Sequence, residues 1–545
     1  MKAITIKTST LSLFVLGALP SAAQHQTAEL TLPYAEGTLP YSLEIREISL
    51  APAVLPNIHS VAAASWEGEW ILMAGRTNGL HGMTGMNAFD PVYENREVWV
   101  INPTTRQSWH KSLETSGASG LSADQVDSLS STNTQYHQQG ETLVIAGGYG
   151  YRRSVSDHRT YDTLSAVNLP GIVAWVKEAA GAETSMASAH IRQISDPYFQ
   201  VTGGALEKLG TEFQLVFGQK YAGRYRPNFN GVYTRQVRRF EMGLDASGNP
   251  VVPAASKMAT PADDAYRRRD LNVVPIVRRT GLGEFEEAAM VLSGVFTPEN
   301  GVWTLPVLIG QGGSVSMQDP GDQASLKQAF QIYHCAKTTL YQRANDECHM
   351  ILFGGLTILE RELVGGSFVR DDQAPFTNQC SAVVRSSDGS LRQYWLHTRF
   401  PLVESNGKEL RFGTNAEFFP KEGLRTLAPK VLDLTVMNQP LVIGHIFGGI
   451  VADAGNGGNT GASGRVFEVV LTPNVPETAL SIRLGPGELT WGPLPVGTSI
   501  LVEESADLIG WRELATGLTA GVYGFDETKA AQKFFRIYPA TEATP

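Results

Sequence analysis

The chain contains the run Ile351-Leu352-Phe353-Gly354-Gly355, in which apolar residues lead directly into a pair of glycines. Such a run is typical of a strand that is buried on both faces and ends where the backbone needs a positive φ or has no room for a side chain. The pattern recurs as an apolar stretch before Gly75, Gly147, Gly218, Gly294, Gly354 and Gly448. The intervals between these glycines lie between 60 and 94 residues, which indicates a repeat architecture.

A second strand follows each glycine. After the first one, the strand Val98-Trp99-Val100-Ile101-Asn102 leaves through Pro103, and Trp109 comes later. This order resembles the kelch repeat, in which a glycine pair ends one strand, a strand and turn follow, and a tryptophan packs between blades. The resemblance implies an all-β fold, a six-bladed kelch-like β-propeller, over residues 24–475. The repeats are longer than the ~50 residues usual for kelch, so long loops are expected, one of them holding a short helix over residues 172–180.

The N-terminal residues 1–23 have the features of a signal peptide. Lys2 and Lys7 precede a short apolar run, and small residues end at Ala23. We therefore expect a secreted or periplasmic protein that begins at Gln24. The apolar run is too short for a bilayer and no later stretch is long enough, so no membrane span is expected.

Two further segments bear on the domain organisation. Residues 41–48 alternate between apolar and polar side chains, as a half-buried strand does, and are expected to complete the last blade and close the ring. Residues 476–545 lack the glycine repeat and are similar to the small C-terminal β module of secreted bacterial proteins, with its "ES-x-DL-x-x-W … FFR" pattern. The role of this module is open between a folded terminal appendage and cell-surface attachment or sorting.

Composition excludes some functions. A net charge of −10 argues against a nucleic-acid binder, because phosphate contacts need a basic field. The chain has three cysteines, Cys335, Cys348 and Cys380, which allow either one disulfide with one free thiol or three thiols. No spacing of cysteine and histidine matches a metal site, so neither a metal nor a cofactor is expected.

Arginine and tyrosine gather just after the first three glycines. In a propeller these positions meet at one mouth, and function in repeat folds lies on such a loop face. The candidate ligand-binding residues are Arg76, Asn78, Tyr149, Tyr151, Arg152, Lys220, Tyr221, Arg224, His334 and Glu417. Arginine forks match carboxylate or phosphate oxygens, so the mouth predicts a ligand with an anionic group. The competing interpretation is a solvated rim, and Arg267-Arg268-Arg269-Asp270 is likewise interpreted as a solvated face.

The stretch Tyr333-His334-Cys335 resembles part of the copper site of galactose oxidase-type propellers. The second histidine, second tyrosine and crosslinked cysteine of that family have no matching positions here, and His445 is only a spatial candidate. Copper is therefore expected only if the protein is an enzyme of that type.

Two functions remain open at this point. The first is an exported binding or scaffold protein that recognises a glycan or protein partner, and the absence of a hydrolase, metalloprotease or phosphate-binding motif favours it. The second is a carbohydrate-active enzyme, because exported kelch propellers include the sialic acid mutarotase family and copper-radical oxidases. Fold alone does not separate them. We expect a monomer, favour the binding protein over the enzyme, and assign no catalytic residues.

Overall fold

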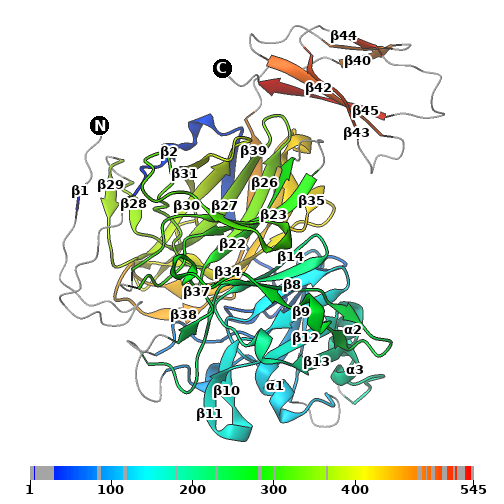
Figure 1. Cartoon of the computed structure of the whole chain (residues 1–545), viewed down its shortest axis with the longest axis vertical. Coiled ribbons are helices and arrows are strands. Elements are labelled where there is room, and N and C mark those ends of the chain that lie inside the picture. Colours follow the sequence, from blue (N-terminus) through cyan, green and yellow to red (C-terminus); the bar gives the residue numbers. More distant parts are fainter. Residues whose placement is uncertain are drawn as a thin grey trace.

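The computed structural model describes residues 5–6, 30–82, 88–114, 119–179, 181–226, 231–279, 285–298, 301–363 and 366–474, together with six strands between 482 and 541. The expected cleavage point before Gln24 lies outside these residues. The chain is all-β, and its main sheets have a β-propeller arrangement (Figure 1).

Consecutive parts of the chain form the first three main sheets, each made of antiparallel neighbours. The first consists of β4 (Ala62–Trp66), β5 (Glu69–Met73), β6 (Glu97–Asn102) and β7 (Gln107–Ser112). The second consists of β8 (Gln135–Gln139), β9 (Thr142–Ala146), β12 (Thr163–Asn168) and β13 (Ile191–Ser195). The third consists of β14 (Ala205–Leu209), β15 (Glu212–Val216), β18 (Val237–Phe240) and β21 (Met258–Ala259).

The second half of the chain continues the series. The fourth sheet consists of β22 (Asn272–Arg279), β23 (Phe285–Leu292), β24 (Val307–Ile309) and β25 (Val315–Met317). The fifth is built on β26 (Ala336–Gln342), β27 (Glu347–Leu356), β30 (Phe376–Arg385) and β31 (Leu391–Arg399), with β2 (Tyr34–Ala35), β35 (Thr426–Ala428) and β36 (Val431–Asp433) at its edges. The sixth consists of β34 (Arg411–Pro420), β37 (Leu441–Ala452), β39 (Val466–Pro473) and β3 (Tyr41–Ile48), with β38 (Thr460–Ala462) paired to β37.

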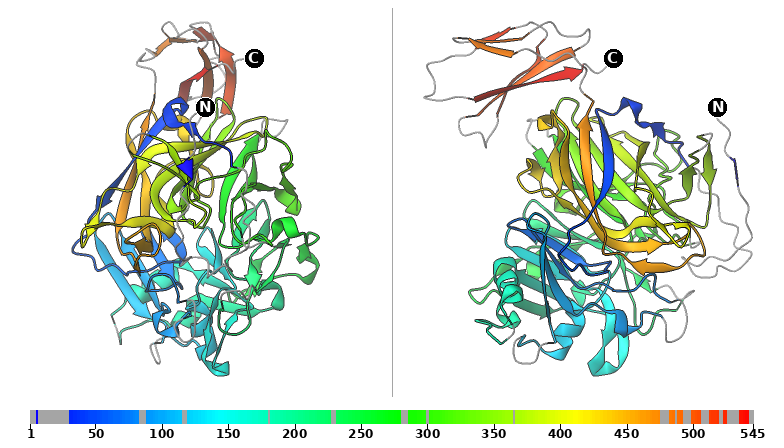
Figure 2. Two further views of the ribbon diagram at one scale, coloured as in Figure 1. Left: turned by 90° about the vertical axis from the view of Figure 1, so that its left-hand side faces the viewer. Right: turned by 180° about the vertical axis from the view of Figure 1, so that it is seen from behind.

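The N-terminal strand β3 lies in the last sheet. It pairs antiparallel with β39 from Tyr41 opposite Pro473 to Ile48 opposite Val466, as the alternation of residues 41–48 predicts. Figure 2 shows the two strands side by side, β3 in blue and β39 in orange. A strand from one end of the chain thus completes a sheet built by the other end.

Pairs of residues that end in glycine, which we call the glycine pairs, connect neighbouring sheets. The predicted glycines belong to pairs in which both residues have positive φ: Ala74-Gly75, Gly147-Gly148, Phe217-Gly218, Ser293-Gly294, Gly354-Gly355 and Gly448-Gly449. The second residue donates its N–H to a carbonyl ahead of the next sheet, as in Gly75 to Ser131 and Gly148 to Val201, and Gly449 donates to Ile58 ahead of the first sheet. The equivalent positions are therefore Gly75, Gly148, Gly218, Gly294, Gly355 and Gly449, one residue later than predicted in three of the runs.

A ring of backbone hydrogen bonds surrounds the centre. Its members, which we call the ring residues, stand just before an innermost strand or, for Asn415, within β34: Ser60, Asn133, Gly203, Asp270, His334 and Asn415. Five of them donate the N–H to the carbonyl of the preceding ring residue, for example His334 N to Asp270 O (3.0 Å) and Ser60 N to Asn415 O (3.3 Å). These bonds satisfy backbone groups that would otherwise be buried without partners.

The hydrophobic core lies between adjacent sheets. Phe213 and Phe240 of the third sheet pack with Val144 of the second, and Trp70 of the first sheet stacks on Phe419 of the sixth, 4.7 Å between ring centroids. Strands in this position are buried on both faces, which explains the unbroken apolar runs before the glycines.

Smaller elements lie in the connections. The short strands are β1 (Thr5–Ile6), β10 (Tyr149–Arg152), β11 (Asp157–Thr160), β16 (Gln219–Lys220), β17 (Val232–Tyr233), β19 (Gly243–Leu244), β20 (Pro250–Val251), β28 (Leu359–Arg361), β29 (Phe368–Arg370), β32 (Glu404–Ser405) and β33 (Lys408–Glu409). The α-helices are α1 (Ala123–Leu129), α2 (Leu169–Lys177) and α3 (Ala187–His190). The helix expected over residues 172–180 is α2, which begins three residues earlier because Asn168 caps it.

The C-terminal strands form two further sheets. One consists of β40 (Ile482–Gly485), β41 (Glu488–Trp491) and β44 (Val522–Gly524), the other of β42 (Thr498–Ser505), β43 (Arg512–Leu518) and β45 (Phe534–Thr541). Figure 1 shows them beyond the propeller, on the side of β26 and β35. Within the described residues no helix is long and apolar enough to cross a membrane.

Candidate functional site

A pocket opens on the side of the ring where the loops after the glycine pairs gather. Every main sheet contributes to its lining, for example through His59, Asn133, Thr202, Tyr333 and Asn415. The first four of these residues precede innermost strands and Asn415 lies in β34, whereas Arg76, Tyr149 and Tyr221 follow glycine pairs. The pocket, which we call the mouth pocket, is thus formed by equivalent positions of the repeat.

Two buried arginines supply its positive charge. Arg76 is 2% exposed, and its Nε and Nη2 donate to Asn78 Oδ1 (3.2 Å) and to Asp90 O (3.0 Å). Arg269 is 7% exposed and lies over the ring of Phe296 at 4.9 Å. Its Nε is 3.4 Å from Asp270 Oδ2 but makes no hydrogen bond among the described residues. A buried cation of this kind attracts an anionic partner.

Asp270 is the carboxyl group of the mouth pocket. Its Oδ1 accepts a hydrogen bond from Asn133 Nδ2 (3.1 Å), and Tyr333 donates its hydroxyl to the same side chain. Burial raises the pKa of Asp270 while Arg269 opposes the shift. The same burial raises the pKa of Tyr333 well above its ordinary value, so Tyr333 remains a hydrogen-bond donor.

Aromatic rings form one wall of the pocket. His81 stacks on Phe89 with 3.9 Å between centroids, and Tyr225 and Tyr149 meet the Phe89 ring edge-on. Burial lowers the pKa of His59 to about 3 and that of His81 to about 4, so both imidazoles are neutral near pH 7. The fixed charges lining the pocket are therefore Arg76, Arg269 and Asp270.

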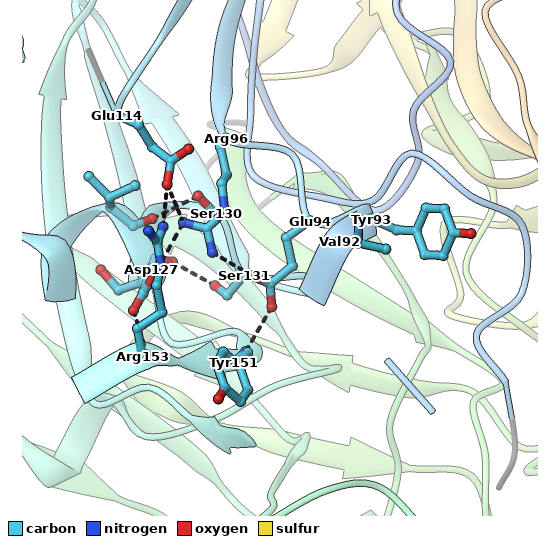
Figure 3. Close-up of polar contacts among 12 residues, drawn as sticks. Val92, Tyr93, Glu94, Arg96, Glu114, Asp127, Ser130, Ser131, Tyr151 and Arg153 are labelled. Atoms are coloured by element: carbon cyan, nitrogen blue, oxygen red, sulfur yellow. Dashed lines mark hydrogen bonds and ion pairs between the residues drawn. The ribbon is translucent and has the colours of Figure 1, made fainter. Parts of the chain in front are cut away.

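Below the aromatic wall, an ionic network joins the first and second sheets (Figure 3). Glu94 accepts a hydrogen bond from the Tyr151 N–H (2.7 Å) and pairs with Arg96 Nη2 (3.1 Å). Arg96 and Arg153 both pair with Asp127, whose side chain is fully buried. A Cβ on Gly150 would lie 2.9 Å from Glu94 Oε1, so this glycine lets β10 approach the carboxylate. The network holds the strand that carries Tyr149.

The structure brings together only some of the predicted site residues. Arg76, Tyr149 and Tyr221 line the mouth pocket, and Asn78 supports Arg76. Four further candidates, which follow the second and third glycine pairs, do not line this pocket: Tyr151, Arg152, Lys220 and Arg224. Arg152 pairs instead with Asp124 at the N-terminal turn of α1, and Lys220 is exposed on β16. Burial raises the pKa of Tyr149 and lowers that of His158, and the nearby Arg224 opposes the first shift and adds to the second.

The last two candidates, His334 and Glu417, line a second compartment in the channel on the other side of the ring residues. Tyr333 and His334 are neighbours in sequence, yet their side chains enter different compartments because successive side chains of an extended chain point to opposite sides.

The interpretation of Arg267-Arg268-Arg269-Asp270 as a solvated face is wrong. Arg268 is completely buried and donates to Leu305 O (2.7 Å), and Arg269 and Asp270 line the mouth pocket. Sequence reasoning also missed His59 and Asn133. For Asn133 an available signal was position, since it stands just before the first strand of its sheet, as Asp270 and His334 do.

The copper site suggested by Tyr333-His334-Cys335 does not fit. Tyr333 binds Asp270, His334 Nε2 lies 2.9 Å from Lys337 Nζ, and Cys335 is buried in the core. His445 packs against Trp70 in the sixth sheet. Among the described residues no group of three or more His, Cys, Asp or Glu side chains could hold a metal ion. Cys335, Cys348 and Cys380 are all buried free thiols, which decides between the two cysteine alternatives.

No protein-family model and no curated protein matches the chain. Among solved structures, the one described as "Structure of YjhT" has a TM-score of 0.38 and 10% identity, and the match covers 78% of this chain and 100% of that one. A GH32 β-fructofuranosidase of Bombyx mori has a TM-score of 0.23, 13% identity and coverage of 76% and 79%. A protein described as a glycoside hydrolase has a TM-score of 0.25, 10% identity and coverage of 92% and 97%. Similarity at this level carries no argument about function.

Proposed function

We propose that the mouth pocket binds a small carboxylated glycan unit and that the protein is an exported glycan-binding propeller. The observation that carries this proposal is Arg269, a buried guanidinium whose Nε makes no hydrogen bond among the described residues. Among the lining residues two guanidinium groups face one carboxyl group, so a ligand carboxylate would balance the charge, and the planar guanidinium fork suits its two oxygens.

The rest of the pocket supports a sugar rather than a bare anion. Tyr225 is only partly buried and offers a flat apolar face to the C–H face of a pyranose. Asp270 offers an acceptor for a hydroxyl group. Because His59 and His81 are neutral, neither repels nor attracts the ligand charge.

The test is a comparison of glucuronate and N-acetylneuraminate with uncharged glucose by isothermal titration calorimetry. We expect the two acids to bind and Arg269→Ala to weaken them by about 10- to 100-fold, since a charged hydrogen bond contributes about 1.5–3 kcal/mol. Arg152→Ala is the matched control, because Arg152 pairs with Asp124 outside the pocket and its loss should leave affinity unchanged. Equal binding by wild type and Arg269→Ala, or binding of an acidic peptide in place of the sugars, would contradict the proposal.

A second candidate function is a carbohydrate-active enzyme of the sialic acid mutarotase type. Asp270 favours it, since a buried carboxyl with a raised pKa beside a tyrosine hydroxyl could exchange a proton with a sugar. NMR of freshly dissolved N-acetylneuraminate distinguishes the two. If wild type accelerates the interconversion of anomers and Asp270→Asn does not, the protein is an enzyme of this type. If wild type does not change the rate, the result supports a binding protein instead.

We further propose that the six main sheets are the blades of one closed propeller over residues 24–475, that residues 476–545 are a separate module, and that the protein is an exported monomer. The matching φ values of the glycine pairs and the bond from Gly449 to Ile58 support the blade number. An experimental structure tests it, and seven blades would contradict it. Mass spectrometry of the exported protein should show a chain starting at Gln24, and light scattering should give the mass of one chain.

A further inference from the structure

The channel compartment opposite the mouth pocket is polar and incompletely satisfied. It is lined by residues of the innermost strands β8, β14, β22, β26 and β34. Three lining side chains, Thr134, Gln135 and Thr338, are buried and have an oxygen with no hydrogen-bond partner among the described residues. Buried polar atoms are normally paired, so three unpaired oxygens among the residues that line one cavity indicate a polar compartment suited to a small molecule with hydroxyl groups.

Lys337 of β26 is the amine of this compartment. Its Nζ lies 2.9 Å from His334 Nε2 and 3.3 Å from Cys335 O, and no ion pair joins it to a carboxylate of the described residues. His334 also makes a hydrogen bond with the Asn415 side chain, which accepts through its amide oxygen when the other ring nitrogen carries the proton. Both contacts of Lys337 are then acceptors. These two acceptors take two positions on Nζ and leave the third for a group in the cavity.

The surrounding charges agree with this arrangement. Glu417 accepts a hydrogen bond from Tyr136, and Glu207 lies 3.3 Å from His137, so each carboxylate has another partner. Burial lowers the pKa of Lys337 and Lys430 adds to that shift, while Glu417, Glu207 and the neighbouring Cys335 oppose it. Burial also keeps His334 neutral, because it lowers the pKa of His334 well below its ordinary value.

We propose that Lys337 is a nucleophilic amine that captures a small aldehyde or ketone in the channel as an imine. The Nζ lone pair forms the N–C bond as the carbonyl π bond breaks. The oxygen takes a proton from water, and the hydroxide so formed takes one proton from nitrogen to give a neutral carbinolamine. A water then protonates the hydroxyl, which leaves as water as the nitrogen lone pair forms the C=N bond, and the resulting hydroxide takes the remaining N–H proton. No oxidant or reductant is needed, and desolvated lysines are the amines that react in this way. The unpaired hydroxyl oxygens of Thr134 and Thr338 are available to hold the hydroxyl groups of an open-chain sugar.

The test is reductive trapping on the full-length protein with glycolaldehyde and sodium cyanoborohydride, followed by peptide mass spectrometry. At pH 7 we expect Lys337 to be modified faster than the exposed Lys220, because each unit by which its pKa is lower gives about tenfold more free amine. Lys430→Met should move the pH midpoint of Lys337 modification upward and Glu417→Gln should move it downward, since these side chains have opposite effects on its pKa. Thermal melting of each variant verifies folding.

Three results would overturn the proposal. The first is modification of Lys220 but not of Lys337 in folded protein, and the second is the same pH profile of modification for both lysines. The third is a pH midpoint of Lys337 modification that changes in neither Lys430→Met nor Glu417→Gln. The inference is independent of the mouth ligand. Arg269→Ala should leave the trapping of Lys337 unchanged, so failure of one proposal is distinguishable from failure of the other.

Discussion

Glu94 is a buried carboxyl group whose protonation changes near neutral pH. It is 6% exposed, and burial raises its pKa to about 7 although Tyr151 and Arg96 favour its ionised form. The folded protein therefore holds this proton more tightly than the unfolded chain does. Its contribution to stability is present below about pH 4.5 and is lost as the pH rises to about 7, by up to about 3 kcal/mol.

Glu94→Gln removes this titration and keeps an acceptor for the Tyr151 N–H. We expect the unfolding free energy of the variant to fall less than that of wild type between pH 5 and pH 8, by about 1–3 kcal/mol. Urea unfolding at the two pH values measures the difference. Glu114→Gln, in the same network but on a more exposed side chain, should retain the wild-type pH dependence. Parallel pH profiles for Glu94→Gln and wild type would refute this role for Glu94.

At the scale of the strand, a glycine can be required for two reasons: the backbone needs a positive φ, or neighbouring atoms leave no room for a Cβ. Two glycines of the second sheet allow these reasons to be separated. A Cβ on Gly147 would lie 2.0 Å from Val201 O, and its φ is 64°. Gly140, in the β8–β9 turn, also has positive φ, 55°, but a Cβ there would meet nothing within 4 Å. One glycine is therefore required by conformation and close packing, the other by conformation alone.

Gly140→Ala should cost about 1–2 kcal/mol, the strain of a left-handed residue. Gly147→Ala should cost about 1–3 kcal/mol more, because the second and third sheets must move apart. Thermal or chemical unfolding of both variants tests this expectation. Equal destabilisation would show that the approach of Val201 O is unimportant.

At the scale of the whole molecule, Arg343 connects the propeller to the C-terminal strands. Its Nε lies 3.2 Å from Asp433 Oδ2 of β36, and its Nη1 donates to Glu503 Oε1 of β42 at 3.0 Å. The three side chains are 8%, 0% and 1% exposed. Since this is a buried network with long-range partners, the two parts are expected to stabilise each other.

Arg343→Ala should destabilise the protein by about 3–5 kcal/mol, the cost of removing one partner from buried charges. Arg512→Ala, which removes the ion pair of the exposed Arg512 in β43 with Glu504 in β42, should cost under about 1 kcal/mol. Differential scanning calorimetry would follow both variants. If the two melt alike, the Arg343 network does not join the C-terminal strands to the propeller.

The fold was predictable from the sequence to the extent that it depends on local patterns. Apolar runs ending in glycine predicted the second strand of every main sheet, and the alternation over residues 41–48 predicted β3 and its partner. The site was less predictable. Arg76, Tyr149 and Tyr221 were found by their place after the glycines, whereas Arg269 and Asp270 were dismissed as part of a charged run.

The sequence by itself determined the strands and the glycine positions, because strand periodicity and the sterics of positive φ act within a few residues. Only the tertiary structure decided that Arg152 pairs with Asp124, that Arg269 is buried beside Phe296, and that the ring residues divide the channel from the mouth pocket. These outcomes depend on contacts between segments that are separated by tens of residues or belong to different sheets. The burial and charge that such contacts impose on a side chain are not encoded in its immediate neighbours.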